Sequence, residues 1–210
     1  MSSAPAHAEL GRAGETGHGA VLYPAIAEAA HRLGADAVGL IDVGRSAGVN
    51  LDVDRVGITY SNGQSLGDPS SPVQLTSTMR GRPVPEHPIP QVVARIAVET
   101  DPVAALPDAV AQVPAHALPV VITTWALSQL PRESRLRFLH RLGEAGAGRT
   151  VAWVSAEGVG VAPAIPTLGD RRAFGHSIIG LALFSQSALH AEALGRCWSR
   201  GRWMAWLAES

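Results

Sequence analysis

Lysine is absent from this chain of 210 residues, and all 17 of its basic side chains are arginine. A Schiff base and a P-loop both require a lysine amine, so the sequence excludes both kinds of chemistry. Cysteine occurs once, at Cys197, which excludes an internal disulfide and a metal site built from several thiolates. No apolar run reaches the ~20 residues of a membrane-spanning helix.

The charges are balanced, with a formal net charge of −1 and a sequence pI of about 6.7. Because there is no basic surplus to neutralise phosphates, nucleic-acid binding is not indicated, and neither is a membrane partner. The eight histidines show no metal-ligand spacing, so no metal is expected. Residues 1–18 lack the charged start and apolar run of a signal peptide, so we expect a cytoplasmic protein.

The pattern along the chain predicts a disordered arm over residues 1–20 and a single domain over residues 21–210. Apolar residues at helical spacing predict a helix over 21–33, and the continuous apolar run at 37–43 is typical of a strand buried on both faces. Further strands are expected at 92–98, 118–123, 150–155, 178–185 and 203–207, helices at 49–56, 103–112 and 131–144, and a hairpin at 57–79. This order predicts an α/β fold, a Rossmann-like three-layer sandwich with a mainly parallel sheet, a β-hairpin insertion and an antiparallel C-terminal edge.

The turn after the first predicted strand, Asp42-Val43-Gly44-Arg45-Ser46-Ala47-Gly48, lies where open parallel sheets bind ligands. Gly44 permits a tight turn, and Gly48 lets the next helix start close to a ligand and offer free amides. Asp42 would repel a pyrophosphate. The turn therefore suits a ligand with an amino group and no phosphate at this point, such as S-adenosylmethionine. The alternative is a structural strand–turn–helix without a ligand.

The spacing D-x-G-x-x-x-G resembles the first motif of class I S-adenosylmethionine-dependent methyltransferases, and it differs from the dinucleotide fingerprint G-x-G-x-x-G. Residues 43–55 resemble the V-G-x-S-A-G-L-N-L-x-x-D-R signature of the uncharacterised bacterial domain-of-unknown-function family 2332. More of that family's pattern recurs at 22–24, 67–73 and 124–131. The family is regarded as methyltransferase-like in fold, with no established substrate. This chain looks like a shortened member with an impaired pocket, because a helix-plus-strand unit is missing after residues 98–103.

The resemblance implies a small-molecule cofactor, S-adenosylmethionine, and a set of residues that would bind it. Residues of the turn would flank its methionine part: Asp42, Gly44, Ser46 and Gly48, with Asn50 as a buttress. Glu99 or Asp101 would hold the ribose, since carboxylates accept strong hydrogen bonds from hydroxyls; alternatively, the pair is a solvated turn and a helix cap. Thr124 and Trp125 would face the methyl donor, although Trp125 could equally be a core residue. The sequence thus predicts a methyltransferase whose acceptor and catalytic residues it does not identify.

A serine hydrolase is one alternative, because residues 44–48 also spell the nucleophile elbow G-x-S-x-G. Ser46 would then attack the substrate, with Asp170 and either His176 or His190 completing the triad. The chain lacks the several upstream strands and the oxyanion segment that this fold needs.

A non-catalytic binding or scaffold protein is the other alternative. In that case the N-terminal arm and the C-terminal tryptophans, Trp198, Trp203 and Trp206, would form a partner surface, although packing across a terminal hairpin also explains the tryptophans. A homodimer is expected if the shortened sheet leaves an apolar edge uncovered.

Overall fold

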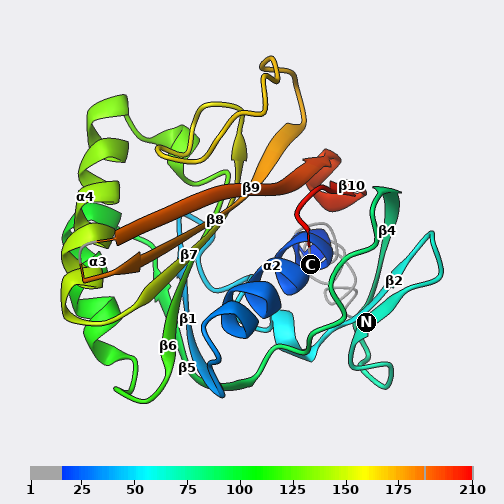
Figure 1. Cartoon of the computed structure of the whole chain (residues 1–210), viewed down its shortest axis with the longest axis horizontal. Helices are drawn as coiled ribbons and strands as arrows, with labels where there is room; N and C mark the ends of the chain where they lie inside the picture. Colours follow the sequence, from blue (N-terminus) through cyan, green and yellow to red (C-terminus); the bar gives the residue numbers. More distant parts are fainter. Residues whose placement is uncertain (1–15, 187, 210) are drawn as a thin grey trace, which may run out of the picture.

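The computed structural model describes residues 16–186 and 188–209 (Figure 1). Most of the predicted arm lies outside the described residues, but the chain is already helical at Thr16. The helices are η1 (Thr16–His18), α2 (Gly19–Arg32), η2 (Val53–Arg55), α3 (Pro102–Gln112), η3 (Leu127–Gln129), α4 (Arg132–Gly148) and η4 (Ser199–Gly201). The strands are β1 (Ala37–Val43), β2 (Gly57–Tyr60), β3 (Ser65–Gly67), β4 (Gln74–Gly81), β5 (Gln91–Val98), β6 (Leu118–Thr124), β7 (Val151–Gly158), β8 (His176–Ser185), β9 (Ala188–Trp198) and β10 (Trp203–Trp206). Among the helices described, none combines the length and apolar character needed to cross a membrane.

These strands form one ten-stranded sheet in the order β3-β2-β4-β10-β9-β8-β7-β6-β1-β5. Strands β5, β1, β6 and β7 are neighbours and run parallel. Strands β8, β9 and β10 follow in antiparallel pairs, and β4 continues the sheet beyond β10. The predicted α/β fold, with a mainly parallel sheet and antiparallel C-terminal strands, is confirmed. Those C-terminal strands lie inside the sheet, whose two edges are β3 and β5.

The hairpin predicted over residues 57–79 is present between β2 and β3, which pair antiparallel. Strand β4 lies parallel to β2, with Thr59 opposite Thr76, so the expected antiparallel pairing of these two strands was wrong. A second turn explains the difference. Asp68 accepts hydrogen bonds from the amides of Ser70 and Ser71 and reverses the chain again. Two reversals return β4 to the direction of β2.

Helix α2 lies inside the curve of the sheet (Figure 1), and every residue from Gly19 to Ala30 is buried. Such a helix needs small apolar residues on all sides, which its alanines supply. Its buried acid, Glu28, pairs with Arg32 at 2.6 Å, and Arg32 also contacts Glu192 on β9. One hydrophobic cluster surrounds α2, and a second fills the space between the opposite face of the sheet and helices α3 and α4.

The helix predicted over residues 49–56 was wrong. Residues 44–52 form turns, followed only by the short η2. The amides of Gly48 and Asn50 donate to the carboxylate of Asp42 at 2.8 and 3.1 Å, which takes them out of a helical pattern. From the other side, Arg95 on β5 holds Asp54 through two hydrogen bonds of 2.7 Å. The segment after β1 is therefore a loop fastened to both β1 and β5.

Candidate functional site

A cavity of about 360 Å³ lies at the carboxyl ends of β1 and β6. The four parallel strands follow one another in the chain in the order β1, β5, β6 and β7, and β5 lies on one side of β1 whereas β6 and β7 lie on the other. The order of these strands therefore reverses between β1 and β6, which form the switch point of the sheet; β2, β3 and β4, which come between β1 and β5 in the chain, lie at its far end. Open α/β sheets bind ligands at such a point, and this volume falls within the ~300–1,000 Å³ of small-molecule sites. The cavity is lined by His18, Asp42, Val43, Gly44, Arg45, Ser46, Val49, Asn50, Thr124, Trp125, Ala126, Gln129 and Arg200.

Asp42 organises the loop that borders this cavity. Its side chain is buried and accepts hydrogen bonds from the amides of Gly48 and Asn50 and from Asn50 Nδ2, at 2.8, 3.1 and 2.9 Å. Burial raises the pKa of the Asp42 carboxyl, although the hydrogen bonds from Asn50 and Gly48 act in the opposite direction. The amides of Gly48 and Asn50 are therefore taken by Asp42 and are not available to a ligand, in contrast to the free amides expected at this turn.

Asn50 connects the loop to the end of β6, because its Nδ2 also donates to Thr124 Oγ1 at 3.1 Å. The next residue, Trp125, has a left-handed backbone with φ of 50°, which is uncommon for a bulky side chain. Its ring lies 4.6 Å from the ring of His18. The structure thus brings Asp42, Gly44, Ser46, Asn50, Thr124 and Trp125 together around one cavity, while Gly48 contributes its amide to Asp42.

A second cavity of about 410 Å³ lies beside the first, above the end of β5. Glu99 and Asp101 line it. Asp101 caps α3 by accepting from the amides of Val103 and Ala104 at 3.0 and 3.4 Å, as the helix-cap alternative predicted. Glu99 is exposed and accepts no hydrogen bond from the described residues, so its carboxylate is the free acceptor of this cavity.

Gly44 lies on the boundary between the two cavities and lines both. Its φ is +142°, and a Cβ built on it would lie 2.9 Å from Cβ of Ala126. Only glycine lets the β1 loop pass this closely to the β6 loop. The two cavities also share Val43, Arg45 and Gln129, so together they follow the carboxyl edge of β5, β1 and β6.

Several residues that line the first cavity were not predicted as site residues from the sequence, among them His18 and Arg200, which lie far from the predicted turn. His18 falls within the predicted arm, and Arg200 falls in a predicted turn between tryptophans. Burial, and then the charge of Arg200, lowers the pKa of His18 to about 4, so this imidazole is neutral at pH 7. Neither residue belongs to a motif. The only signal that could have found His18 was its position just before the apolar pattern of α2.

Glu157, at the end of β7, is also a residue that the sequence did not single out. One carboxylate oxygen, Oε1, accepts from the amides of Ala126 and Leu127 at 3.0 and 3.1 Å, while the buried Oε2 has no hydrogen-bond partner among the described residues. Burial raises the pKa of Glu157 to about 7. Glu157 therefore fixes the loop after β6, which borders both cavities.

The residues proposed for a hydrolase do not form a catalytic triad with Ser46. Asp170 lies 3.1 Å from Nε2 of His176, but it also forms two hydrogen bonds with Arg196, at 2.5 and 2.9 Å. His190 pairs with Leu183 toward the other end of the β8–β9 pair. Within the described residues no hydrogen bond links Ser46 to a histidine, and the helix that a nucleophile elbow requires is replaced by turns. The same described part of the chain holds no group of three His, Cys, Asp or Glu side chains placed to bind a metal.

The sheet and its edge define a Rossmann-like α/β protein with a cavity of small-molecule size at the switch point. Within that class, the model of the family described as "Uncharacterized protein conserved in bacteria (DUF2332)" matches residues 6–105 and 97–206, and the chain belongs to this family. The two matches overlap at residues 97–105, where β5 ends and where the sequence predicted a missing unit. Neither a curated protein nor a solved structure matches the chain.

Proposed function

We propose that this protein binds S-adenosylmethionine along the carboxyl edge of β5, β1 and β6 and serves as a methyltransferase for an acceptor still to be identified. The observation that carries the proposal is the pair of adjoining cavities at the switch point, which share a boundary that includes Gly44 and Ala126. A long ligand with two different ends suits two cavities that share one wall.

The residues present fit the two ends of this cofactor. The free carboxylate of Glu99 can accept hydrogen bonds from both ribose hydroxyls in the second cavity. The first cavity would hold the methionine part against Ser46, Thr124 and Trp125. Asp42 supports this site indirectly, because its oxygens are already bound within the loop.

When bound, S-adenosylmethionine supplies an electrophilic methyl group on its sulfur. Transfer of that group requires alignment and the exclusion of water more than acid–base assistance. The chain provides alignment through its fastened loops: Asp42 and Asn50 fix the loop after β1, and Glu157 fixes the loop after β6. The ring of Trp125 forms an apolar wall of the first cavity.

Isothermal titration calorimetry with S-adenosylmethionine and S-adenosylhomocysteine tests the proposal, and the informative variant is Gly44→Val. The valine would overlap Ala126 and fill the boundary of the cavities, so we expect at least a 100-fold loss of affinity, which corresponds to about 3 kcal/mol or more.

Gly63→Val is the matched control. Gly63 also has a left-handed φ, of +91°, but a Cβ there meets no atom within 4 Å and lies far from both cavities. It should bind like the wild type. Equal affinity of the Gly44→Val variant, or no binding to the wild type at millimolar ligand, would contradict the proposal; the latter result would favour a non-catalytic scaffold.

A further inference from the structure

The turn that carries Arg200 has an unusual backbone. Three consecutive residues, Ser199, Arg200 and Gly201, have positive φ angles of 50°, 56° and 90°. The first two are not glycine, and a left-handed backbone is energetically unfavourable for such residues. Strain of this kind persists only where the surroundings fix it, and it is concentrated at functional sites.

The surroundings do fix this turn. The buried hydroxyl of Ser77 donates to the carbonyl of Gly201 at 2.7 Å, and the amide of Ser199 donates to the carbonyl of Gly175 at 3.0 Å. The amide of Thr78 donates to the carbonyl of Arg202 at 2.8 Å. A Cβ on Gly201 would lie 2.6 Å from the carbonyl oxygen of Gly17, so the turn is also packed against the start of α2. Hydrogen bonds with two separate segments, β4 and Gly175, and packing against Gly17 hold Arg200 at the wall of the first cavity.

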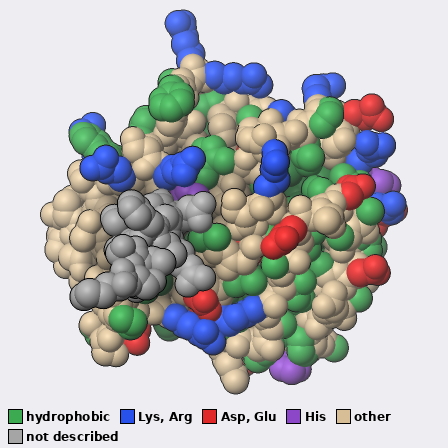
Figure 2. Space-filling view, turned by 180° about the vertical axis from the view of Figure 1, so that it is seen from behind, with side chains coloured by type: hydrophobic (Ala, Val, Ile, Leu, Met, Phe, Trp, Pro, Cys, Tyr) green, Lys and Arg blue, Asp and Glu red, His purple; other side chains and the backbone are tan. Residues whose placement is uncertain are grey.

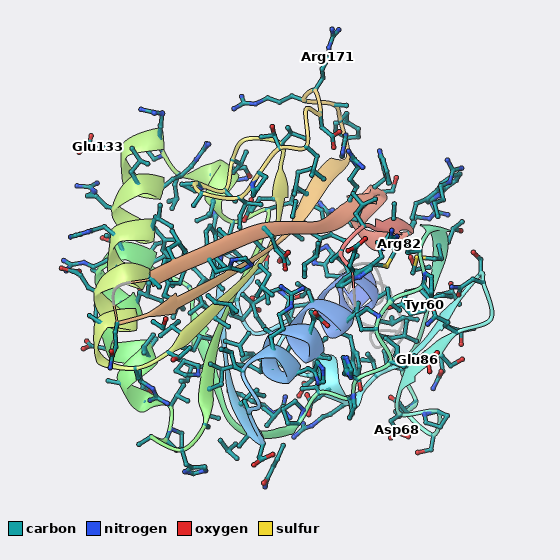
Figure 3. The ribbon with its side chains drawn as sticks, in the orientation of Figure 1. Tyr60, Asp68, Arg82, Glu86, Glu133 and Arg171 are labelled. Atoms are coloured by element: carbon teal, nitrogen blue, oxygen red, sulfur yellow. The ribbon has the colours of Figure 1, made fainter. Side chains whose placement is uncertain are left out.

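Two arginines, Arg45 and Arg200, line the first cavity together with Asp42. Within the described residues, neither Arg200 nor Arg45 has a carboxylate within 4.0 Å. The carboxylate of Asp42 is enclosed by its own loop, and His18 is neutral at pH 7. Arginine side chains also gather over the upper part of the face in Figure 2, and Figure 3 shows Arg171 extending outward from the segment between β7 and β8. An anion entering this cavity would meet two guanidinium groups that form no ion pair with a carboxylate of the described residues.

We infer that the first cavity binds the anionic group of its ligand, a carboxylate or a phosphate, between Arg200 and Arg45. Guanidinium groups suit both anions because their planar N–H donors match paired oxygens. The inference rests on the proposed function for its first probe, S-adenosylhomocysteine, whose carboxylate would occupy this position.

The test compares S-adenosylhomocysteine with S-adenosyl-3-thiopropylamine, which keeps the adenosine, the sulfur and the amino group but lacks the carboxylate. Calorimetry on the full chain should show that Arg200→Gln weakens binding of S-adenosylhomocysteine about 10- to 100-fold, the range for a lost hydrogen bond to a charged group. The same variant should change the affinity of the decarboxylated compound less than threefold. Arg200→Lys should recover part of the lost affinity, because it restores the charge.

Arg202→Gln is the control, since Arg202 follows the same turn but lines a different pocket. It should leave both affinities unchanged, and urea unfolding of each variant verifies the fold. Equal binding of S-adenosylhomocysteine by the wild type and Arg200→Gln would overturn the inference while leaving the proposed function standing.

If neither adenosyl compound binds the wild type, the proposed function fails, and inorganic phosphate becomes the probe. Phosphate binding that is lost in Arg200→Gln would then support the anion site with a phosphate ligand. No phosphate binding would overturn the inference as well.

Discussion

Replacing Glu157 with Gln is expected to raise the free energy of unfolding at pH 8 by about 3 kcal/mol and to leave it almost unchanged at pH 4. The Glu157 side chain is buried, and burial raises its pKa to about 7 from the ordinary 4.5. A raised pKa in the folded state means that stability is fully present below pH 4.5 and is lost as the pH rises through 7. Because a tenfold change in proton affinity corresponds to ~1.4 kcal/mol, raising the pKa from 4.5 to about 7 gives the expected difference.

Glutamine should keep the fold, because its side-chain oxygen can accept from the amides of Ala126 and Leu127 as Glu157 does. Glu157→Ala removes that acceptor and should destabilise the protein at every pH. Glu133→Gln is the control, because Glu133 points into solvent from α4 (Figure 3). Urea unfolding from pH 4 to 8 measures the free energy of unfolding of the wild type and of each variant. A difference between Glu157→Gln and the wild type that stays constant over this range would show that Glu157 does not titrate near pH 7.

The His18 side chain changes the free energy of unfolding with pH in the opposite direction, over nearly the same pH range as Glu157. The pKa of His18 is lowered to about 4 in the folded protein. Its contribution to the free energy of unfolding is therefore fully present above pH 6.5 and is lost as the pH falls through 4. The two residues therefore offset each other in the wild type. In the Glu157→Gln variant the effect of His18 becomes visible, as a free energy of unfolding that rises between pH 4 and pH 6.5.

Replacing Asp42 with Ala is expected to lower the free energy of unfolding by about 3 kcal/mol at pH 7 and to release the loop over residues 44–52. The substitution leaves the amides of Gly48 and Asn50 and the side chain of Asn50 without their acceptor. Each buried donor left unpaired costs about 1–3 kcal/mol, but the relieved desolvation of the carboxylate offsets part of the sum.

Asp36→Ala is the matched control, because Asp36 precedes the same strand and is exposed. Urea unfolding gives the change in stability, and hydrogen exchange of the Gly48 and Asn50 amides reports on the loop. A loss below 1 kcal/mol together with unchanged exchange would mean that Asp42 does not hold the loop.

The fold was predictable where the information is local. The apolar run Ala37–Val43 and the apolar pattern of α2 specify a buried strand and a buried helix by themselves, and both are confirmed. The helix expected after β1 was wrong because tertiary contacts compete with local propensity there: Asp42 takes the amides and Arg95, some 40 residues away, holds Asp54. The direction of β4 relative to β2 depends on a second turn, at Asp68, which the predicted single hairpin did not include.

The candidate site was predictable only in part, because some of its residues are brought there by tertiary contacts that the local sequence does not specify. Gly44, Thr124 and Trp125 follow predicted strands, so their meeting at one sheet edge follows from parallel topology. His18 and Arg200 come from opposite ends of the chain, and no spacing in the sequence shows that α2 and the turn at η4 meet there. The charge of Glu157 likewise depends on burial, which is a property of the packed sheet.

The most direct test of the central claim is a ¹H–¹⁵N correlation spectrum of the tryptophan indoles, recorded as S-adenosylhomocysteine is added. The chain has five tryptophans, of which Trp125 lines the first cavity, and Trp125→Phe assigns its signal. We predict that saturating ligand shifts the Trp125 indole and leaves the indole of the buried Trp206, in β10, in place. An unmoved Trp125 signal at millimolar ligand, with the other indoles also unchanged, would contradict an adenosyl site at this edge of the sheet.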